Sequence, residues 1–234
     1  MIPLGDSTPR RCVPIVTYLL IGLNVLMFMV ELAQGPRLQA FIYRWGAVPA
    51  RLEQWPQHPQ VLITLVTSMF LHGGWLHLIS NMVYLWIFGD NVEDRLGSFR
   101  YLLFYLIGGV AAGIIQATFT PGSRVPGIGA SGAVAAVLGA YLVFFPYAQV
   151  LVGVPLFFWF EVFAVPAVLV LGFWFVSQFF NGLLTLAIGP AAFTGGVAWW
   201  AHVGGFVTGL ILGPAIRPRW RRCPPPWSPY RYYY

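Results

Sequence analysis

One serine and one histidine stand at positions in this sequence where they could carry out a hydrolytic reaction. Ser131 lies within Gly129-Ala-Ser-Gly132 at the expected start of a helix, and His202 lies near the start of another glycine-rich helix. Small neighbours leave the serine hydroxyl accessible, and the free N–H groups at a helix N-terminus can stabilise an oxyanion. His202 could take the proton of the hydroxyl and later return it to a leaving amine. Taken singly, however, Ser131 could simply cap its helix, and His202 could be a packing residue.

A second polar cluster, made of His72, His77 and Asn81, lies in residues 70–81. His77 and Asn81 are four residues apart, so they share one face of a helix. As hydrogen-bond donors beside Ser131, they would complete an oxyanion hole. A zinc site is the rival interpretation, because histidine is a common zinc ligand. No Asp, Glu or Cys is expected at the same depth, and a zinc site would leave Ser131 without a role, so we expect neither a metal nor another cofactor.

The composition places these residues in a membrane protein. Only 9% of the 234 residues are charged and 58% are hydrophobic, whereas soluble domains have about 25% charged residues. Such a chain has too little polar surface to cover a water-soluble globule, and its two cysteines exclude a disulfide-rich scaffold. All thirteen basic residues are arginine and gather at segment ends. This distribution favours topology signals over a nucleic-acid surface, so we expect no nucleic-acid partner.

Six stretches are long and apolar enough to be spanning helices, which need roughly 20 apolar residues. They are expected at 15–32, 75–90, 101–119, 131–146, 162–181 and 199–216. Six spans place both termini on one side of the membrane, and nine of the thirteen arginines fall on that side. Both termini are therefore expected to be cytoplasmic. The predicted fold class is all-α, a polytopic bundle of six transmembrane helices.

One domain, residues 14–218, is expected between a cytoplasmic segment at 1–13 and a Pro- and Tyr-rich, disordered cytoplasmic tail at 219–234. Within this domain, the long first loop at 33–74 mixes aromatic and polar residues, which suits the headgroup region. The first span has no small-residue cleavage site after it and is expected to be retained as a signal-anchor.

Counting along the expected helices places the candidate side chains at one level. Ser131 and His202 each lie fifteen residues before the cytoplasmic ends of their helices, near Pro146 and Arg217, which corresponds to roughly 22 Å of helix. In a hydrocarbon core about 30 Å thick, both then lie several ångströms below the outer boundary. His77 lies near the same level. Three polar groups from three helices are therefore expected in one buried layer.

The segment before Ser131 should dip into the membrane. Residues 121–130 contain two prolines and three glycines and cannot be helical throughout. Irregular backbone is tolerated at membrane depth only where it is buried in protein or lines a watery cavity, and such a cavity would supply the water for hydrolysis. The acidic residues all lie in loops or at span ends. The reaction is therefore expected to use a Ser131–His202 dyad and not a triad.

Glycine spacing predicts close packing between the two helices that carry the dyad. Gly205, Gly209 and Gly213 repeat every four residues and lie on one face of the last helix. Small residues let two helix backbones approach closely in lipid. The same spacing is also found where helices pack in membranes without any catalytic role, so by itself it does not indicate function.

Together, these residues resemble the rhomboid family of intramembrane serine proteases, from about Val13 to Pro218. Residues 129–132 resemble the nucleophile motif of the family and residues 201–205 resemble its sixth-helix motif, while 88–94 and 166–178 also read as bacterial rhomboid sequence. The resemblance implies that Ser131 is the nucleophile and His202 the base.

The resemblance also implies roles for the supporting residues. His77, Asn81 and the Ser131 backbone N–H would bind the oxyanion, and His72 would be structural or would organise water. Gly129, Gly132 and Gly205 belong to the two motifs and would support the site. Some members have Tyr or Phe four residues after the nucleophile, packed on the catalytic histidine. Ala135 stands there in this chain, which leaves open what packs on His202.

The family resemblance implies a six-helix core in the lipid bilayer, here expected in a bacterial inner membrane. Its substrates are single-span membrane proteins, which enter near the second and fifth helices and are commonly cut after a small residue. A mobile loop at about 183–198 would cap the site. The Trp-Arg pair often found in the first loop of the family is not evident.

Two other functions are compatible with the same composition. A non-catalytic rhomboid relative that binds membrane clients would usually lack the Ser or the His, and both are present. A small transporter would need polar residues along a path across the bilayer, and the lower halves of the fourth and sixth helices have none. Substrate identity, cleavage site, oligomeric state and lipidation of Cys12 or Cys223 stay open.

Overall fold

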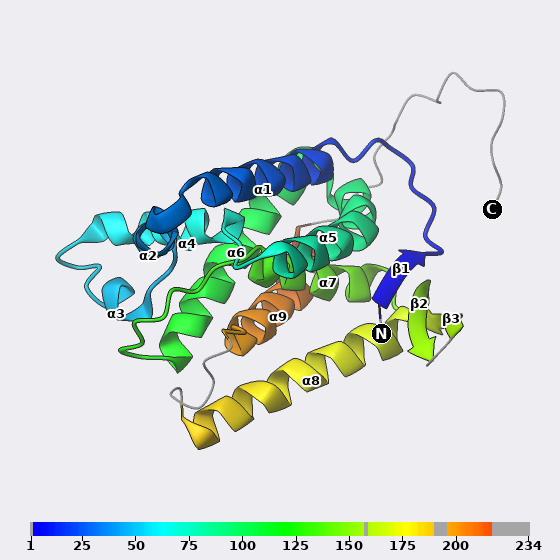
Figure 1. Cartoon of the computed structure of the whole chain (residues 1–234). Helices are drawn as coiled ribbons and strands as arrows, with labels where there is room; N and C mark the ends of the chain where they lie inside the picture. Colours follow the sequence, from blue (N-terminus) through cyan, green and yellow to red (C-terminus); the bar gives the residue numbers. More distant parts are fainter. Residues whose placement is uncertain (1, 157–158, 190–195, 217–234) are drawn as a thin grey trace.

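The structure, a computed structural model, describes residues 2–156, 159–189 and 196–216 and is predominantly helical (Figure 1). A helix is present at each of the six predicted places. These helices are α1 (Ile15–Ala33), α5 (Trp75–Leu96), α6 (Ser98–Phe119), α7 (Ser131–Phe144), α8 (Ala167–Ile188) and α9 (Trp199–Ala215). The predicted tail at 219–234 lies outside the described residues.

Three of these helices, α1, α6 and α8, are long and apolar enough to cross a membrane. Helix α5 meets the same test together with residues 59–70, and the two parts are bent by 84° at the break between them. Helix α7 has 14 residues and so covers only about 21 Å, less than a hydrocarbon core of about 30 Å. The chain is thus a polytopic α-helical membrane protein, while the count of six spans stays a prediction.

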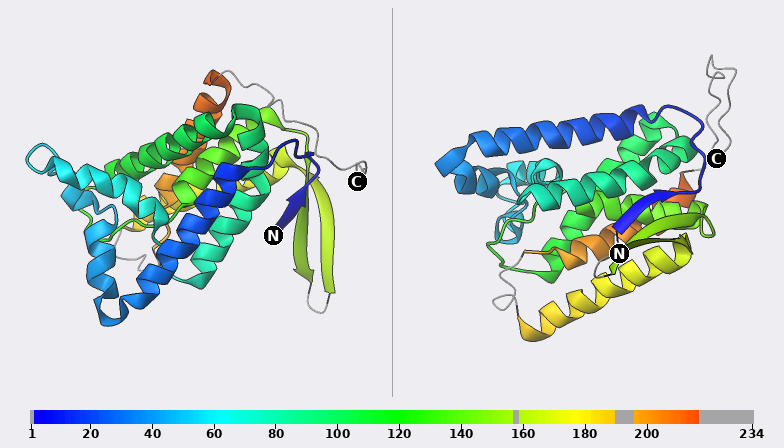
Figure 2. Two further views of the ribbon diagram at one scale, coloured as in Figure 1. Left: turned by 90° about the horizontal axis from the view of Figure 1, so that it is seen from above. Right: turned by 45° about the vertical axis from the view of Figure 1, so that its right-hand side comes forward.

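Helix α7 forms the centre of the bundle. Every residue from Gly132 to Tyr141 is buried, and α7 packs against α5, α6 and α9. Helices α1 and α8 lie at opposite edges of the bundle (Figures 1 and 2), and most of their apolar side chains are exposed. In a membrane these exposed side chains face lipid, whereas the large side chains of the interior, such as Tyr101 and Phe104, are fully buried.

Helices α7 and α9 touch through their backbones. A Cβ atom at Gly205 would overlap the carbonyl oxygen of Gly132, and one at Gly209 would overlap that of Ala136. From the other side, a Cβ at Gly139 would overlap the carbonyl oxygen of Phe206. Close helix contact without side chains in between is the arrangement that small residues permit in lipid. The predicted packing of these two helices is therefore confirmed.

The connections between the long helices contain short helical segments and strands. Residues 33–74 form η1 (Gly35–Arg37), α2 (Leu38–Trp45), α3 (Pro49–Leu52), η2 (Pro59–Ile63), α4 (Thr64–Thr67) and η3 (Ser68–Phe70). Helix α5 ends at Leu96, and Gly97, which follows it, has a φ of 81° that favours glycine. Helix α6 starts at the next residue, Ser98. Buried Glu93 accepts hydrogen bonds from the backbone N–H groups of Val16 and Thr17 (3.2 and 2.9 Å). It thus caps α1, whose first N–H groups have no partner within the helix.

A small sheet at the end of the bundle was not predicted. Strands β1 (Ile2–Asp6), β2 (Gln149–Leu156) and β3 (Trp159–Pro166) pair antiparallel in the order β1-β2-β3 (Figure 2). The fifth span, predicted at 162–181, was wrong at its start, because residues up to Pro166 belong to β3. Proline removes one hydrogen bond from a helix interior and disfavours helical conformation in the residue before it. The aromatic and β-branched residues that precede Pro166 therefore pair as a strand.

The loop predicted at 183–198 also differs. Helix α8 continues to Ile188, so the first six residues of that loop are helical. Residues 190–195 lie outside the described residues. From Gly196 the described chain leads into α9, which begins at Trp199.

The backbone contact between α7 and α9 can be tested with a matched pair of variants. Gly205→Val should force the two helices apart and lower the free energy of unfolding by about 1–3 kcal/mol or more, as overpacking does in tightly packed cores. Gly22→Val in α1 is the control, because a Cβ at Gly22 has no neighbour within 4 Å. Thermal unfolding in detergent would compare the two. Equal unfolding temperatures would contradict the close packing at Gly205.

Candidate active site

The residues predicted to carry chemistry come together in one cavity of about 820 Å³. Ser131 from α7, His202 from α9, and His77 and Asn81 from α5 all line it. Trp174 of α8 lines it as well, and residues 196–198 close one side. His72 is buried beside this cavity with its ring edge against the ring of His77, the two centroids 5.1 Å apart. Ser131, His202 and His77, the three groups that the depth count placed at one level, thus line one cavity together with Asn81.

Ser131 is the first residue of α7, and an irregular segment precedes it as predicted. Gly129 has a φ of 120°, a conformation that favours glycine, and its N–H donates to the carbonyl of Ser68 (2.9 Å). Further back, Ala47 and Gly127 exchange two backbone hydrogen bonds (3.0 and 2.8 Å). The segment is therefore fastened to the first loop. It delivers the chain to α7 with the first N–H groups of the helix unpaired within it.

His77 presents one specific nitrogen to the turn before Ser131. The N–H of Gly73 donates to His77 Nδ1 (3.3 Å), so Nδ1 must be unprotonated and Nε2 carries the hydrogen in the neutral ring. A Cβ atom at Gly129 would lie only 2.6 Å from His77 Nε2. Glycine at this position thus lets the ring approach. The Nε2–H of His77 is a hydrogen-bond donor next to the serine.

Asn81 is buried one turn further along α5. Its side-chain Nδ2 donates to the carbonyl of His77 (2.8 Å), which holds the amide on the same face of the helix as the His77 ring. An amide nitrogen has two hydrogens, so a second N–H is left for a group in the cavity. His77 and Asn81 can therefore both donate into the cavity that they line.

His202 is held by side chains of α8, a contact that was not predicted. Its Nδ1 lies 2.8 Å from Oε1 of Gln178, and its ring packs on that of Trp174 with the centroids 5.7 Å apart. Ala135, at the position that is Tyr or Phe in some rhomboids, instead faces α9 where a Cβ at Gly205 would lie, 3.2 Å away. The ring packing that the sequence left open thus comes mainly from α8, with an edge contact from Trp199 of α9 at 6.3 Å between centroids. A polar side chain in the middle of an apolar helix was the signal for Gln178.

Glu31 is the second residue that the sequence did not single out. It lies at the end of α1, is only 1% exposed, and both carboxylate oxygens accept the backbone N–H of His72 (3.0 and 3.1 Å). The sequence placed all acidic residues away from the catalytic level, and Glu31 nevertheless reaches the segment that leads into α5. Glu31 thus positions the backbone at His72 and has no hydrogen bond to Ser131 or His202 among the described residues.

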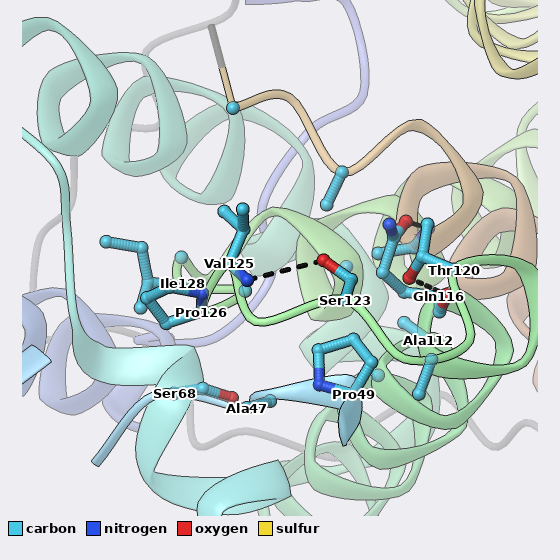
Figure 3. A pocket seen from close by; sticks show the side chains of 18 of the residues that line it. Ala47, Pro49, Ser68, Ala112, Gln116, Thr120, Ser123, Val125, Pro126 and Ile128 are labelled. Carbon is cyan, nitrogen blue, oxygen red and sulfur yellow. Dashed lines mark hydrogen bonds between the residues drawn. The ribbon is translucent and has the colours of Figure 1, made fainter. Parts of the chain in front are cut away.

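A smaller cavity of about 270 Å³ lies behind the segment that precedes α7 (Figure 3). Gly129, Gly132 and Ala201 line it, so it adjoins the starts of both α7 and α9. Gln116 of α6, also in its wall, accepts the backbone N–H of Ala201 through Oε1 (3.0 Å). This hydrogen bond fixes the first turn of α9, one residue before His202.

No cluster of three or more His, Cys, Asp or Glu side chains that could hold a metal ion occurs in the described parts of the chain. The donors in the site are nitrogen and oxygen groups suited to proton transfer and to oxyanion binding. The arrangement can deprotonate a serine and stabilise the negative charge that its attack creates.

Comparison with known proteins gives one family. The model of the Rhomboid domain matches residues 59–219. "Rhomboid protease GluP" of Bacillus subtilis (strain 168) is 38% identical over 134 residues, 55% of this chain and 24% of that protein. "Rhomboid protein 1, mitochondrial" of Saccharomyces cerevisiae is 29% identical over 200 residues, 84% and 51% of the two chains. "RHOMBOID-like protein 6, mitochondrial" of Arabidopsis thaliana is 32% identical over 169 residues, 72% and 46%. This chain thus spans about half or less of the length of these relatives.

The role of Glu31 is testable through stability. Glu31→Leu removes the acceptor and leaves the buried N–H of His72 without a partner, which should cost about 1–3 kcal/mol of unfolding free energy. Glu31→Gln keeps one oxygen acceptor and should lose clearly less. Thermal unfolding of both variants in detergent would give the two values. If the two variants unfold at the same temperature, the carboxylate does not hold the His72 segment.

Proposed function

Because the chain belongs to the rhomboid family, we propose that it is an intramembrane serine endopeptidase in which Ser131 is the nucleophile and His202 the base. The observation that carries the proposal is the shared cavity. Ser131 lines it at the first residue of α7, the His202 ring lines it from α9, and two donor side chains line it from α5. A nucleophile, a base and oxyanion donors are the minimum set for acyl transfer.

The reaction begins with proton transfer. His202 takes the hydroxyl proton of Ser131 at Nε2 while the serine oxygen attacks the peptide carbonyl. The carbonyl oxygen becomes an oxyanion, which accepts hydrogen bonds from the Ser131 backbone N–H, from Nε2 of His77 and from the amide of Asn81. These donors are in place before the charge forms, so they stabilise the transition state without reorganisation.

Hydrolysis is completed by collapse of the tetrahedral intermediate and then by attack of water on the acyl-enzyme. The imidazolium of His202 gives its proton to the leaving amine, and the C–N bond breaks to leave an acyl-enzyme on Ser131. A water molecule in the cavity then loses a proton to His202 and attacks the ester carbonyl. The proton returns to the Ser131 oxygen as the acid product leaves. Gly129 and Gly132 keep the nucleophile open to the substrate, and Gly205 keeps the base close to it.

The proposed substrates are single-span membrane proteins. Leu76 of α5 lines the cavity and is itself exposed, and Trp174 of α8, which also lines it, is next to the exposed Phe173. A transmembrane segment arriving from the bilayer would meet this wall first. The protein is an integral membrane protein; a bacterial inner membrane with cytoplasmic termini is the location we propose. His72 would order the loop or its water.

The nucleophile and base are tested by labelling with a fluorophosphonate, a probe that reacts with activated serines. Wild-type protein in detergent should be labelled at Ser131, whereas Ser131→Ala and His202→Ala should lose both the label and the cleavage of a reconstituted single-span substrate. Without the base, the hydroxyl stays a poor nucleophile. Folded wild-type protein that neither labels nor cleaves would instead favour a client-binding relative.

Asn81 is tested separately as an oxyanion donor. Asn81→Ala should lower kcat about 100- to 1,000-fold, as for loss of one oxyanion donor. Ser80→Ala is the matched control, because Ser80 also donates to the carbonyl of His77 (3.0 Å) and also lines the cavity. Substrate cleavage by both variants would be measured in proteoliposomes. A similar loss in both variants would remove Asn81 from the oxyanion hole.

A further inference from the structure

We propose that Gln178 is a positioning residue that fixes the tautomer and ring orientation of His202, so that a neutral amide takes the place of the acid of a catalytic triad. The inference rests on the proposed function. Gln178 lies in the middle of α8, is only 7% exposed, and its Oε1 lies 2.8 Å from His202 Nδ1. A buried amide aimed at the ring of the base is a costly feature in an apolar helix.

The direction of this hydrogen bond follows from the groups behind it. The hydroxyl of Ser177 lies 2.6 Å from the carbonyl oxygen of Trp174, and a carbonyl can only accept. The Ser177 hydrogen is therefore committed to Trp174, and its oxygen must accept from its other neighbour. That neighbour is the Gln178 side chain, 3.0 Å away through Nε2. The amide thus turns its nitrogen to Ser177 and its oxygen to His202.

An amide oxygen that faces Nδ1 dictates the state of the ring. Oxygen can only accept, so Nδ1 of His202 must carry the hydrogen, and in the neutral ring Nε2 is then left with its lone pair. Nε2 is the atom that takes the serine proton in the proposed mechanism. In Ser-His-Asp enzymes, an amide in place of the acid lowers kcat about 10⁴-fold because it stabilises the wrong tautomer. Ser177 prevents that outcome here by fixing which end of the amide meets the ring.

Ring orientation is restrained by the same helix. Trp174 precedes Gln178 by four residues, one helical turn, and its ring packs at 33° to that of His202. One hydrogen bond and one ring face therefore hold the imidazole from α8, while α9 holds its backbone. These contacts take the place of the aromatic residue that packs on the histidine in some rhomboids and that is Ala135 in this chain.

The test compares two substitutions of Gln178 with one control. Gln178→Leu keeps the approximate volume and removes the acceptor, whereas Gln178→Glu keeps an oxygen acceptor and, when protonated, a donor to Ser177. Asn181→Leu is the control, because Asn181 lies one turn along α8 and bonds the backbone of Ser177 (2.7 Å). Each protein in detergent would be assayed for kcat, for KM, for fluorophosphonate labelling of Ser131 and, with ¹⁵N-histidine, for the tautomer of His202.

Gln178→Leu should lower kcat about 100- to 10,000-fold with KM changed less than about threefold, and should shift the ¹⁵N signals of His202 away from the Nδ1–H tautomer. Gln178→Glu should stay within about tenfold of wild type, and Asn181→Leu should match wild type in both readouts. The four histidines of the chain make the His202 signals assignable by their loss in His202→Ala.

The outcomes separate this inference from the proposed function. Wild-type protein that is not labelled at Ser131 would refute the function itself. Labelled wild-type protein together with an unchanged kcat and tautomer in Gln178→Leu would refute the role of Gln178 alone. If Gln178→Leu does not fold, the wild-type spectrum decides, because a neutral His202 protonated at Nε2 contradicts the proposed hydrogen-bond direction.

Discussion

The backbone contact between α7 and α9 is the constraint on which the remaining geometry depends. Ser131 is the first residue of α7, and His202 lies in the first turn of α9. Glycine at positions 205 and 209 lets the two helix axes come closer than any larger residue would allow. Ser131 and His202 are thereby held by regular backbone and not by loops. Helices α5 and α6 pack around this pair and add the donors and the hydrogen bond from Gln116. The glycines, by letting the two helices pack closely, thus fix the positions of Ser131 and His202.

Within that frame, His77 and His202 are set to opposite tautomers by their neighbours. A backbone N–H at Nδ1 makes His77 a donor at Nε2, whereas an amide oxygen at Nδ1 makes His202 an acceptor at Nε2. One ring can then stabilise negative charge while the other takes a proton. Both residues are histidine, so the difference between their proposed roles comes from the group that bonds Nδ1 of each ring.

Local signals made much of this structure predictable. The lengths of apolar stretches, together with the prolines and glycines of 121–130, place the helices and the irregular approach to Ser131 close to where they lie. The strand pair that ends at Pro166 was missed because an apolar run of aromatic and β-branched residues suits a span as well as a strand. Glu31 and Gln178 could be noticed in the sequence as polar residues in apolar helices. Their partners, His72 and His202, could not be predicted, because they lie on segments that are distant in sequence.

A neutral network suits a base that lies inside a membrane. A carboxylate next to His202 would stabilise the imidazolium, but it would have to be desolvated while the ring is still neutral, and a buried unpaired charge is expensive. The amide of Gln178 is already satisfied by Ser177 and has no charge to bury. It orients the ring and stabilises the imidazolium less than a carboxylate would, so more of the activation barrier must be lowered elsewhere. In the proposed mechanism, the donors from α5 and from the start of α7 therefore stabilise the oxyanion and make up for the stabilisation that the acid of a triad gives to the base.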